Sequence, residues 1–260
     1  MSMTNPEVSE QLVLVTGGAR GLGLAITNAV LKAGGSVVVD YHTSKEKAEA
    51  LARENPGRVF AFQADVTDKE QVERLFREAE AAAGRPIDSV VNNALADFSF
   101  NGDLRPKAGD ITWDSFDRQL KGTLEGALNV IQAALPGFEK AGSGRIVNIG
   151  TNLVQNPVVP YHDYTAAKAA LMALTRTFAA DLGPKGVRVN MISGGLLRTT
   201  DASSATPEAV FDLIAQQTPL GRVTSPEEFA DAAILFLSPL SRAVTGQNLD
   251  REEHTSELQS

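Results

Sequence analysis

Residues 12–23 read LVLVTGGARGLG: a run of four apolar residues, a glycine-rich turn and the start of a helical pattern. Glycine at positions 17, 21 and 23 lets the backbone adopt positive φ and approach a ligand closely. A helix that begins near Gly21 directs its free N–H groups and positive dipole end toward an anion at the turn. This order of strand, turn and helix favours a dinucleotide-binding turn over an ordinary tight turn.

The rest of the chain alternates between apolar strand patterns and helical patterns. Strands are predicted at Leu12–Thr16, Ser36–Tyr41, Val59–Gln63, Ser89–Asn92, Arg145–Ile149 and Val187–Ile192. Apolar residues recur at spacings of three and four in Leu22–Ala33, Lys45–Glu54, Lys69–Ala83, Trp113–Glu139 and Tyr161–Leu182. Gly34-Gly35 predicts the end of the first helix, and Asp68 and Ser225-Pro226 predict helix starts. Strands this apolar, each followed by a helix, predict an α/β fold: one doubly wound, Rossmann-like parallel sheet with helices on both faces.

Two long stretches without a periodic pattern, Leu95–Ile111 and Gly194–Thr206, follow predicted strands. Ligands bind at such strand ends in open α/β sheets. Loops of this length inside one domain are usually functional or disordered. We expect both stretches to form walls of a substrate pocket. Disorder is the alternative for the second, which is rich in Ser, Thr and Ala.

Composition excludes several classes of protein. The 260 residues are 43% hydrophobic, which is enough for a large core without metals or disulfides. Cysteine is absent and the three histidines are scattered, so we expect no metal site. The net charge of −8 disfavours nucleic acid and anionic membranes as partners. The first residues lack a signal-peptide pattern and no apolar run is long enough to cross a bilayer, so a cytoplasmic protein is expected.

Tyr164 and Lys168 lie four residues apart, so a helix places both on one face. A phenol with a pKa of about 10 is a weak acid–base catalyst at neutral pH. A nearby ammonium stabilises the phenolate, and we therefore expect Lys168 to lower the pKa of Tyr164. The pair predicts proton transfer to the oxygen of a carbonyl group. The alternative is a core tyrosine beside a lysine that extends to solvent.

The spacing Thr-Gly-x-x-x-Gly-x-Gly at residues 16–23 resembles the short-chain dehydrogenase/reductase family. Four further segments agree in order and spacing: Asp65-Val66, Asn92-Asn93-Ala94, the Tyr164–Lys168 pair, and Asn190–Thr199. The resemblance extends from about Leu12 to Asn248. It implies an enzyme that uses a nicotinamide dinucleotide to reduce a carbonyl or oxidise an alcohol.

The resemblance also implies roles for individual residues. Tyr164 is the expected general acid, Lys168 tunes it and holds the cofactor ribose, and Thr151 and Thr123 complete the catalytic group. Cofactor contacts are implied for Gly17, Arg20, Gly21, Leu22, Gly23, Tyr41, His42, Asp65, Val66, Asn92, Ala94, Lys168, Gly195, Leu197 and Thr199.

Four positions depart from the family's pattern. Thr151 stands where a serine usually contacts the substrate oxygen, and we expect its hydroxyl to substitute, although it also suits a plain strand end. Thr123 stands where an asparagine usually supports a water through a backbone kink. A hydrogen bond from Thr123 to an upstream carbonyl is expected to keep that bend. Leu95 replaces a glycine and Gly194 a proline, both beside the expected cofactor.

The choice between NAD and NADP depends on the residues after the second strand. An acid about twenty residues beyond the glycine turn indicates NAD, and Asp40 fits that rule. Alignment with the family instead places Tyr41 at the usual acidic position. Arg20 occupies the place of a basic residue typical of NADP-dependent members, and His42 with its neighbours adds donors for a phosphate. NADP(H) is the expected cofactor, with NAD(H) possible and a solvated Arg20 as the alternative.

The end of the chain does not resemble the family. We expect one reductase domain over residues 1–249 and a tail over residues 250–260 that is artefactual or disordered. From Glu252 the tail resembles a translated sequencing-library adapter, and a native polar tail is the alternative. In the family the final strand supports assembly, so a homodimer or homotetramer is expected if that strand is intact.

Within the family the chain looks most like the 3-oxoacyl-[acyl-carrier-protein] reductase group, through residues 116–118, 132–136 and the Tyr164 helix. The leading hypothesis is NADPH-dependent reduction of a 3-oxoacyl thioester or similar ketone. The departures at Thr123, Leu95 and Gly194 motivate a second one, a dinucleotide-binding sensor or scaffold without turnover. A dehydrating or epimerising enzyme is a third, which the glycine spacing disfavours.

Overall fold

A sheet of seven parallel strands forms the centre of the protein in this computed structural model, which describes residues 6–95, 98, 100–198, 203 and 206–250. The strand order is β3-β2-β1-β4-β5-β6-β7. The chain runs outward from β1 to β3 and then crosses to β4, so the order reverses between β1 and β4, where open sheets bind ligands. The strands are β1 (Leu12–Val15), β2 (Ser36–Tyr41), β3 (Val59–Gln63), β4 (Ser89–Asn92), β5 (Gly144–Ile149), β6 (Val187–Ser193) and β7 (Asn248–Asp250).

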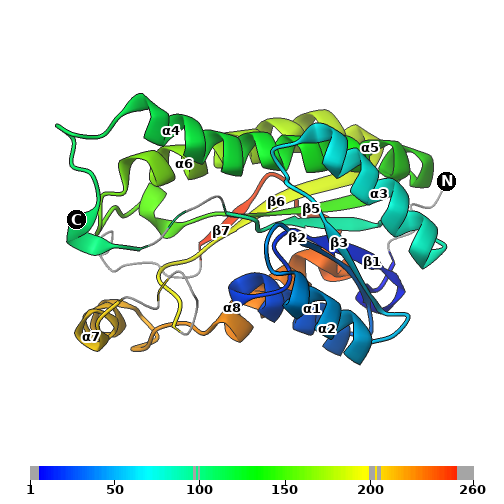
Figure 1. Cartoon of the computed structure of the whole chain (residues 1–260), viewed down its shortest axis with the longest axis horizontal. Helices are drawn as coiled ribbons and strands as arrows, with labels where there is room; N and C mark the ends of the chain where they lie inside the picture. The colour runs from blue at the N-terminus through cyan, green and yellow to red at the C-terminus, as the bar shows by residue number, and fades with distance from the viewer. Residues whose placement is uncertain (1–5, 96–97, 99, 199–202, 204–205, 251–260) are drawn as a thin grey trace.

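Helices cover both faces of the sheet (Figure 1). One face carries α1 (Gly21–Lys32), α2 (Lys45–Glu54) and α8 (Pro226–Leu237), and α1 packs along α8. The opposite face carries α3 (Lys69–Ala83), α4 (Trp113–Leu120), α5 (Gly126–Ala141) and α6 (His162–Leu182). A further helix, α7 (Glu208–Gln217), lies apart from both layers. None of the helices within the described ranges combines the length and apolarity needed to span a bilayer.

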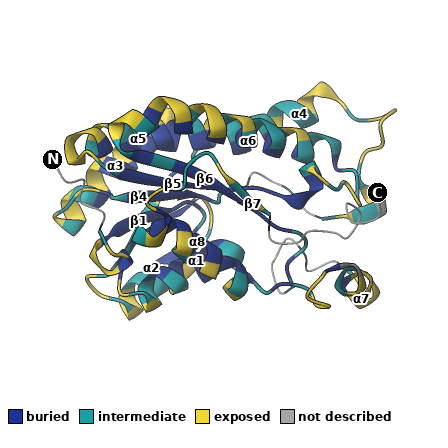
Figure 2. Ribbon diagram, turned by 180° about the vertical axis from the view of Figure 1, so that it is seen from behind, coloured by how far each residue is buried: buried dark blue, intermediate teal, exposed yellow. Residues whose placement is uncertain are grey.

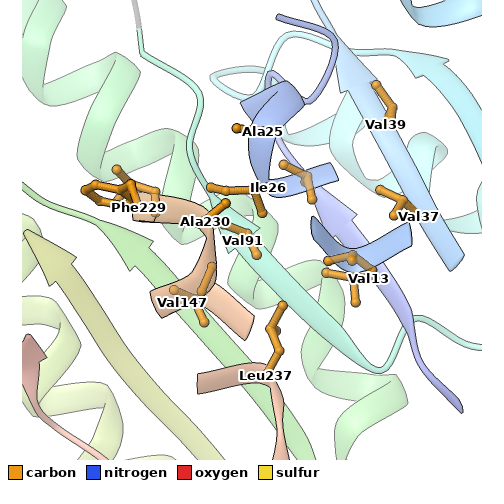
Figure 3. Packing of buried hydrophobic residues seen from close by; sticks show 14 of the residues in the cluster. Val13, Ala25, Ile26, Val37, Val39, Val91, Val147, Phe229, Ala230 and Leu237 are labelled. Carbon is orange, nitrogen blue, oxygen red and sulfur yellow. The ribbon is translucent and has the colours of Figure 1, made fainter. Parts of the chain in front are cut away.

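Two apolar cores fill the spaces between the sheet and its helices. On one face Ile26 of α1 and Leu237 of α8 pack over strand valines that include Val13 and Val91 (Figure 3). The other core centres on Phe138 of α5. The central strands β1, β2, β4, β5 and β6 are mostly buried, whereas the outer surfaces of the helices are exposed (Figure 2). This explains why the strand segments are apolar throughout and the helices are amphipathic.

The sequence predictions of fold class and element bounds are confirmed, with most bounds within one residue. The predicted starts at Asp68 and Ser225 are also confirmed, since both side chains cap the helices that follow them. One prediction needs correction: Trp113–Glu139 is not a uniform α-helix. It contains a π-helical turn, Lys121–Glu125, and ends at Ala141. Glycine on either side of Thr123, at 122 and 126, weakens the α-helical preference there.

Both long loops follow strands, as expected, and contain little regular structure in their described parts. The first includes a single 3₁₀ turn, Gly102–Leu104. At the other end of the domain, β7 pairs with β6 and includes Asp250, the first residue of the expected tail. The remaining tail residues, 251–260, lie outside the described residues.

We expect Phe138→Ala to lower the free energy of unfolding by about 3–5 kcal/mol, because it leaves a cavity in a packed core. The Phe138 side chain is 1% exposed and its ring covers Gly144, where an added Cβ would lie 2.4 Å from it. Urea denaturation measures the change. Leu240→Ala is the matched control because that side chain is 83% exposed. A loss below 1 kcal/mol for Phe138→Ala would contradict the packing described here.

Candidate active site

The glycine-rich turn between β1 and α1 has the backbone geometry that its sequence predicts. Gly17 and Gly21 adopt positive φ, at 63° and 52°. A Cβ at Gly23 would lie 2.2 Å from the carbonyl oxygen of Gly17, so no larger residue fits there. The side chain of Arg20, the N-cap residue, makes no capping hydrogen bond, and Leu22 packs against the core below. The turn therefore fits a pyrophosphate, held by backbone N–H groups at a helix N-terminus.

Thr16 joins this turn to the end of β4. Its hydroxyl accepts hydrogen bonds from the backbone N–H groups of Asn93 and Ala94, at 2.9 Å each. The side-chain amide of Asn93 donates in return to the Thr16 carbonyl at 2.9 Å. Asn92 points elsewhere and donates to Asn148 Oδ1 at 2.8 Å. The predicted segments 16–23 and 92–94 are thus fastened together at the point where the strand order reverses.

Asp40 lies beneath the glycine turn at the end of β2. Its Oδ2 accepts from the Gly17 N–H at 3.4 Å, and Oδ1 has no hydrogen-bond partner among the described residues. The side chain is 2% exposed, and burial raises the pKa of Asp40 to about 7. A carboxyl buried this deeply supports the turn from below, which argues against the ribose contact that the general NAD rule assigns to it.

The residues expected near the adenosine separate into surface and core positions. Arg20 and His42 are exposed, on the turn and just after β2 respectively. The Tyr41 side chain is instead 7% exposed and packs in the core. After β3, Asp65 accepts hydrogen bonds from the N–H and hydroxyl of Thr67. Arg20 and His42 are therefore the exposed members of this predicted group.

Val66 is held between the sheet and α5. Its carbonyl oxygen accepts a hydrogen bond from the Asn129 amide at 2.9 Å. An added Cβ at Gly126 would lie 2.8 Å from its side chain. This close packing brings the end of β3 against the start of α5 and positions Val66 beside the end of β4.

Tyr164 and Lys168 lie on α6 and are buried, at 5% and 3% exposure. Lys168 Nζ donates to the carbonyl of Ile149, the last residue of β5, at 2.7 Å and lies 5.8 Å from the centre of the Tyr164 ring. Thr151, two residues after β5, hydrogen-bonds through its hydroxyl to Tyr164. The structure therefore brings all three predicted residues together at the carboxyl end of β5.

The expected lowering of the Tyr164 pKa is wrong for this structure. Burial raises the pKa of Tyr164 to about 12, and the hydrogen bond with Thr151 only partly offsets that increase. Burial also lowers the pKa of Lys168 to about 8. Both shifts have one cause, since a low-polarity environment disfavours the charged form of each group. Lys168 directs its ammonium to the Ile149 carbonyl, and burial dominates the pKa of the phenol.

Thr123 lies in the π turn, but the predicted hydrogen bond to an upstream carbonyl does not form. Its Oγ1 is buried without a partner among the described residues. The bend comes from the backbone instead, because the Gly126 N–H donates to the Lys121 carbonyl five residues earlier. Such π turns occur frequently at functional sites.

A small hollow of about 10 Å³, with room for about one water molecule, gathers many of the predicted residues from five parts of the chain. It lies between the ends of β1, β3 and β4, the π turn with α5, and α6. Its lining includes Thr16, Val66, Asn92, Ala94, Thr123 and Lys168. Asn92 Oδ1 and Thr123 Oγ1 are both buried there without hydrogen-bond partners among the described residues. The hollow is therefore a small chamber beside Lys168 with two unpaired polar atoms at its wall.

The two other departures from the family's pattern have packing explanations. Leu95 packs against the buried cluster formed by Leu153, Tyr161 and Tyr164. Gly194 lies against Phe229 of α8, where an added Cβ would come within 2.7 Å of the ring. Phe229 therefore occupies space that a residue with a side chain would need.

The predicted segment after β6 is described only in part. Gly195 is half-buried, and Leu197 packs in the core on the α8 side. The predicted contact residue Thr199 lies outside the described residues. The structure thus places Gly195 and Leu197 just beyond the carboxyl end of β6, on the same edge of the sheet as the glycine turn.

Sequence reasoning missed two groups of residues at this site. Thr16 and Asn93 belong to recognised segments, but their mutual hydrogen bonds join strands that are 77 residues apart in the chain. Phe98 and Phe100 stack or pack edgewise on Tyr164. Two aromatic residues within an otherwise polar loop were the available signal for them.

Comparisons with known proteins agree over nearly the whole chain. Residues 17–251 match a family model described as enoyl-(acyl carrier protein) reductase. The chain is 31% identical over 241 residues to the 3-oxoacyl-[acyl-carrier-protein] reductase FabG of Staphylococcus aureus, covering 91% of this chain and 94% of that protein. It is 29% identical over 252 residues to the chloroplastic NADPH-dependent aldehyde reductase 2 of Arabidopsis thaliana, covering 91% and 90%.

A solved structure extends this likeness to the fold. A gluconate 5-dehydrogenase of Burkholderia cenocepacia, in complex with NADP and tartrate, superposes with a TM-score of 0.84 at 29% identity. The match covers 94% of each chain.

We expect Asp40→Asn to stabilise the protein at pH 8 more than at pH 5. The raised pKa of Asp40, about 7, means that the folded state keeps its proton where the unfolded state has lost it. The contribution of Asp40 to stability therefore falls as pH rises from about 4 to 7, and Asn removes that loss. The gain at pH 8 should exceed the gain at pH 5 by about 2 kcal/mol.

Urea denaturation at the two pH values measures this difference. Asp110→Asn, which replaces an exposed carboxyl, is the control. An equal gain at both pH values, or a net destabilisation at pH 8, would show that the buried charge of Asp40 carries no cost.

Proposed function

This chain belongs to the short-chain dehydrogenase/reductase family, a family of NAD(P)-dependent oxidoreductases, and we propose that it reduces a ketone to an alcohol with NADPH. The observation that carries the proposal is the buried Tyr164, which is hydrogen-bonded to Thr151 and adjacent to Lys168. A 3-oxoacyl thioester or a similar ketone is the proposed substrate, from the likeness to the FabG reductases.

The protein's own contribution is proton transfer and positioning. A bound nicotinamide supplies hydride to the carbonyl carbon. Tyr164 donates its phenolic proton to the carbonyl oxygen as the alcohol O–H bond forms. A pKa of about 12 keeps the phenol protonated at neutral pH but makes it a weak acid, so proton transfer requires stabilisation of the phenolate that remains. The Thr151 hydroxyl donates a hydrogen bond to the same carbonyl oxygen and orients it.

Lys168 supplies positive charge next to the phenol after proton loss. The phenolate that remains on Tyr164 is stabilised by an ammonium within the same buried site, where charge interactions are strong. The small hollow beside Lys168, with Asn92 and Thr123 on its wall, has room for one water molecule near the ammonium. We propose that Lys168 also contacts the cofactor ribose. Its ammonium lies at the carboxyl end of β5, on the same edge of the sheet as the glycine turn.

The preference for NADPH rests on Arg20 and His42. Both are exposed beside the glycine turn, where a guanidinium and an imidazole can meet the phosphate on the adenosine ribose. Asp40 is buried under the turn and does not compete for that position. The proposed cofactor contacts also include the turn residues Gly17 to Gly23 and the segments near Asp65, Asn92 and Gly195.

We expect Tyr164→Phe to lower kcat at least 10²-fold, because it removes the proton donor while keeping the ring and its packing. The measurement is the rate of NADPH oxidation with a panel of ketones and S-acetoacetyl-N-acetylcysteamine. Wild-type protein, assayed separately under the same conditions, is the reference. Binding of NADPH should stay within threefold, as judged by calorimetry. Full activity in the Phe variant would remove Tyr164 from the mechanism. Saturable NADPH binding by wild-type protein without any turnover would instead favour the sensor or scaffold hypothesis.

We expect Arg20→Ala to raise the dissociation constant for NADPH about tenfold and to leave that for NADH within twofold, because one charge-assisted contact to the ribose phosphate is lost. Calorimetric titration with both dinucleotides gives the ratio. Arg53→Ala, an arginine on the outer surface of α2, is the matched control. An equal loss for both cofactors would place Arg20 on the shared pyrophosphate, and no loss would leave it solvated.

A further inference from the structure

Tyr164 belongs to a cluster of four aromatic rings. This aromatic cluster consists of Phe98, Phe100, Tyr161 and Tyr164, with Leu153 beside it. The Phe98 ring stacks on the Tyr164 ring with centroids 4.3 Å apart and planes 15° apart. Such offset stacking is a favourable arrangement for two aromatic rings. The phenol that donates the proton is therefore also one wall of an aromatic cluster.

The other two rings complete the cluster by edge contacts. Phe100 packs edgewise on Phe98 at 5.0 Å and on Tyr164 at 6.0 Å. Tyr161 meets Phe98 at 5.2 Å and 78°. The rings of Phe98 and Phe100 therefore flank the ring that carries the Tyr164 hydroxyl. A carbonyl compound bonded to that hydroxyl would have these rings as its nearest neighbours.

Polar contacts fix the cluster in place. The Tyr161 hydroxyl accepts a hydrogen bond from the Gly102 N–H at 2.8 Å. Arg105 donates to the carbonyls of Pro160 and Gly102, at 3.1 and 2.9 Å. The loop after β4 is thereby joined to the segment before α6 at two points. The rings belong to a built wall of the site rather than to a chance contact.

Among the described residues, the hydrophobic side chains that pack with the cluster are Leu95, Leu153 and Val159. A substrate that carries a carboxylate or several hydroxyls next to its carbonyl would lose hydration there without gaining a partner. A planar apolar ketone would lose little favourable hydration on binding there and would gain contacts with the rings. The wall therefore discriminates by shape and polarity close to the reacting carbonyl.

We propose that the aromatic cluster makes this protein selective for flat, apolar ketones, in which an aryl or conjugated ring adjoins the carbonyl, and that Phe98 is the specificity-determining residue. This inference rests on the proposed ketone reduction and narrows its substrate class. Hydride goes to the carbonyl carbon, the Tyr164 proton goes to the oxygen, and NADPH leaves as NADP⁺. The substrate ring stacks against the cluster while its oxygen meets Tyr164 and Thr151.

The test compares 1-tetralone with S-acetoacetyl-N-acetylcysteamine as substrates of wild-type, Phe98→Ala and Phe98→Leu protein. Wild type should show a kcat/KM for 1-tetralone at least tenfold above that for the thioester. Both variants should lower that ratio about tenfold, because stacking is lost. Phe98→Leu keeps most of the apolar volume but removes the flat ring. It therefore tests the contribution of ring stacking in a protein that is expected to stay folded. Trp113→Ala removes a ring from a separate stacked pair on α4 and should leave the ratio unchanged.

A binding arm separates this inference from the reductase proposal. Calorimetry with 1-naphthol, a flat phenol that cannot be reduced by hydride, measures binding to the cluster without turnover. Binding by wild type that weakens about tenfold in Phe98→Leu supports the cluster even when no ketone is reduced, and only the reductase proposal then fails. Turnover of the thioester with neither 1-tetralone turnover nor 1-naphthol binding overturns the cluster's role and leaves the reductase standing. A substrate ratio unaffected by both Phe98 variants also overturns it.

Discussion

The hydroxyl of Thr16 accepts two backbone hydrogen bonds from Asn93 and Ala94, and the Asn93 amide returns one to the Thr16 carbonyl. This exchange fastens the ends of β1 and β4 at the reversal of strand order. The glycine turn, the polar hollow and the α6 pair all take their positions from that junction, because each lies directly beyond one of these strands or the neighbouring β5. Parallel strands alone bring carboxyl ends to one edge, but only specific side-chain bonds fix the turn relative to Tyr164.

Burial governs the chemistry of the site more than local charge pairing does. Asp40, Tyr164 and Lys168 are all nearly inaccessible, and each has a pKa shifted toward its neutral form. A protonated phenol suits proton donation, and a lysine with a pKa of about 8 exchanges protons readily near neutrality. Asp40 has a structural role instead. Burial of its carboxyl destabilises the charged form, but the carboxyl accepts a hydrogen bond from the Gly17 N–H and so supports the glycine turn. The same low polarity that raises the pKa of Tyr164 comes partly from the aromatic rings stacked on it.

The unusual residues of this chain are compensated by contacts from distant segments. Phe229 of α8 fills the space beside Gly194, and Leu95 completes the apolar wall near Tyr164. The π turn keeps a bend at Thr123 through a backbone hydrogen bond from the Gly126 N–H to the Lys121 carbonyl, while the threonine hydroxyl has no partner within the described part of the chain. These substitutions therefore alter the shape of the site without removing the phenol, the ammonium or the glycine turn. Membership of an oxidoreductase family and retention of these groups agree with an NAD(P)-dependent dehydrogenase or reductase.

Periodicity and turn chemistry in the sequence determined the element order, the parallel sheet and the roles proposed for the glycine turn and for Tyr164 with Lys168. These depend on residues close together in the chain, such as the glycines at 17, 21 and 23 or a spacing of four on α6. The tertiary structure decided what depends on contacts between distant segments: the burial of Asp40, the upward shift of the Tyr164 pKa, the π turn and the stacking of Phe98 on Tyr164. Burial and ring stacking arise only when the chain has folded, because they depend on which non-neighbouring side chains exclude water from a group.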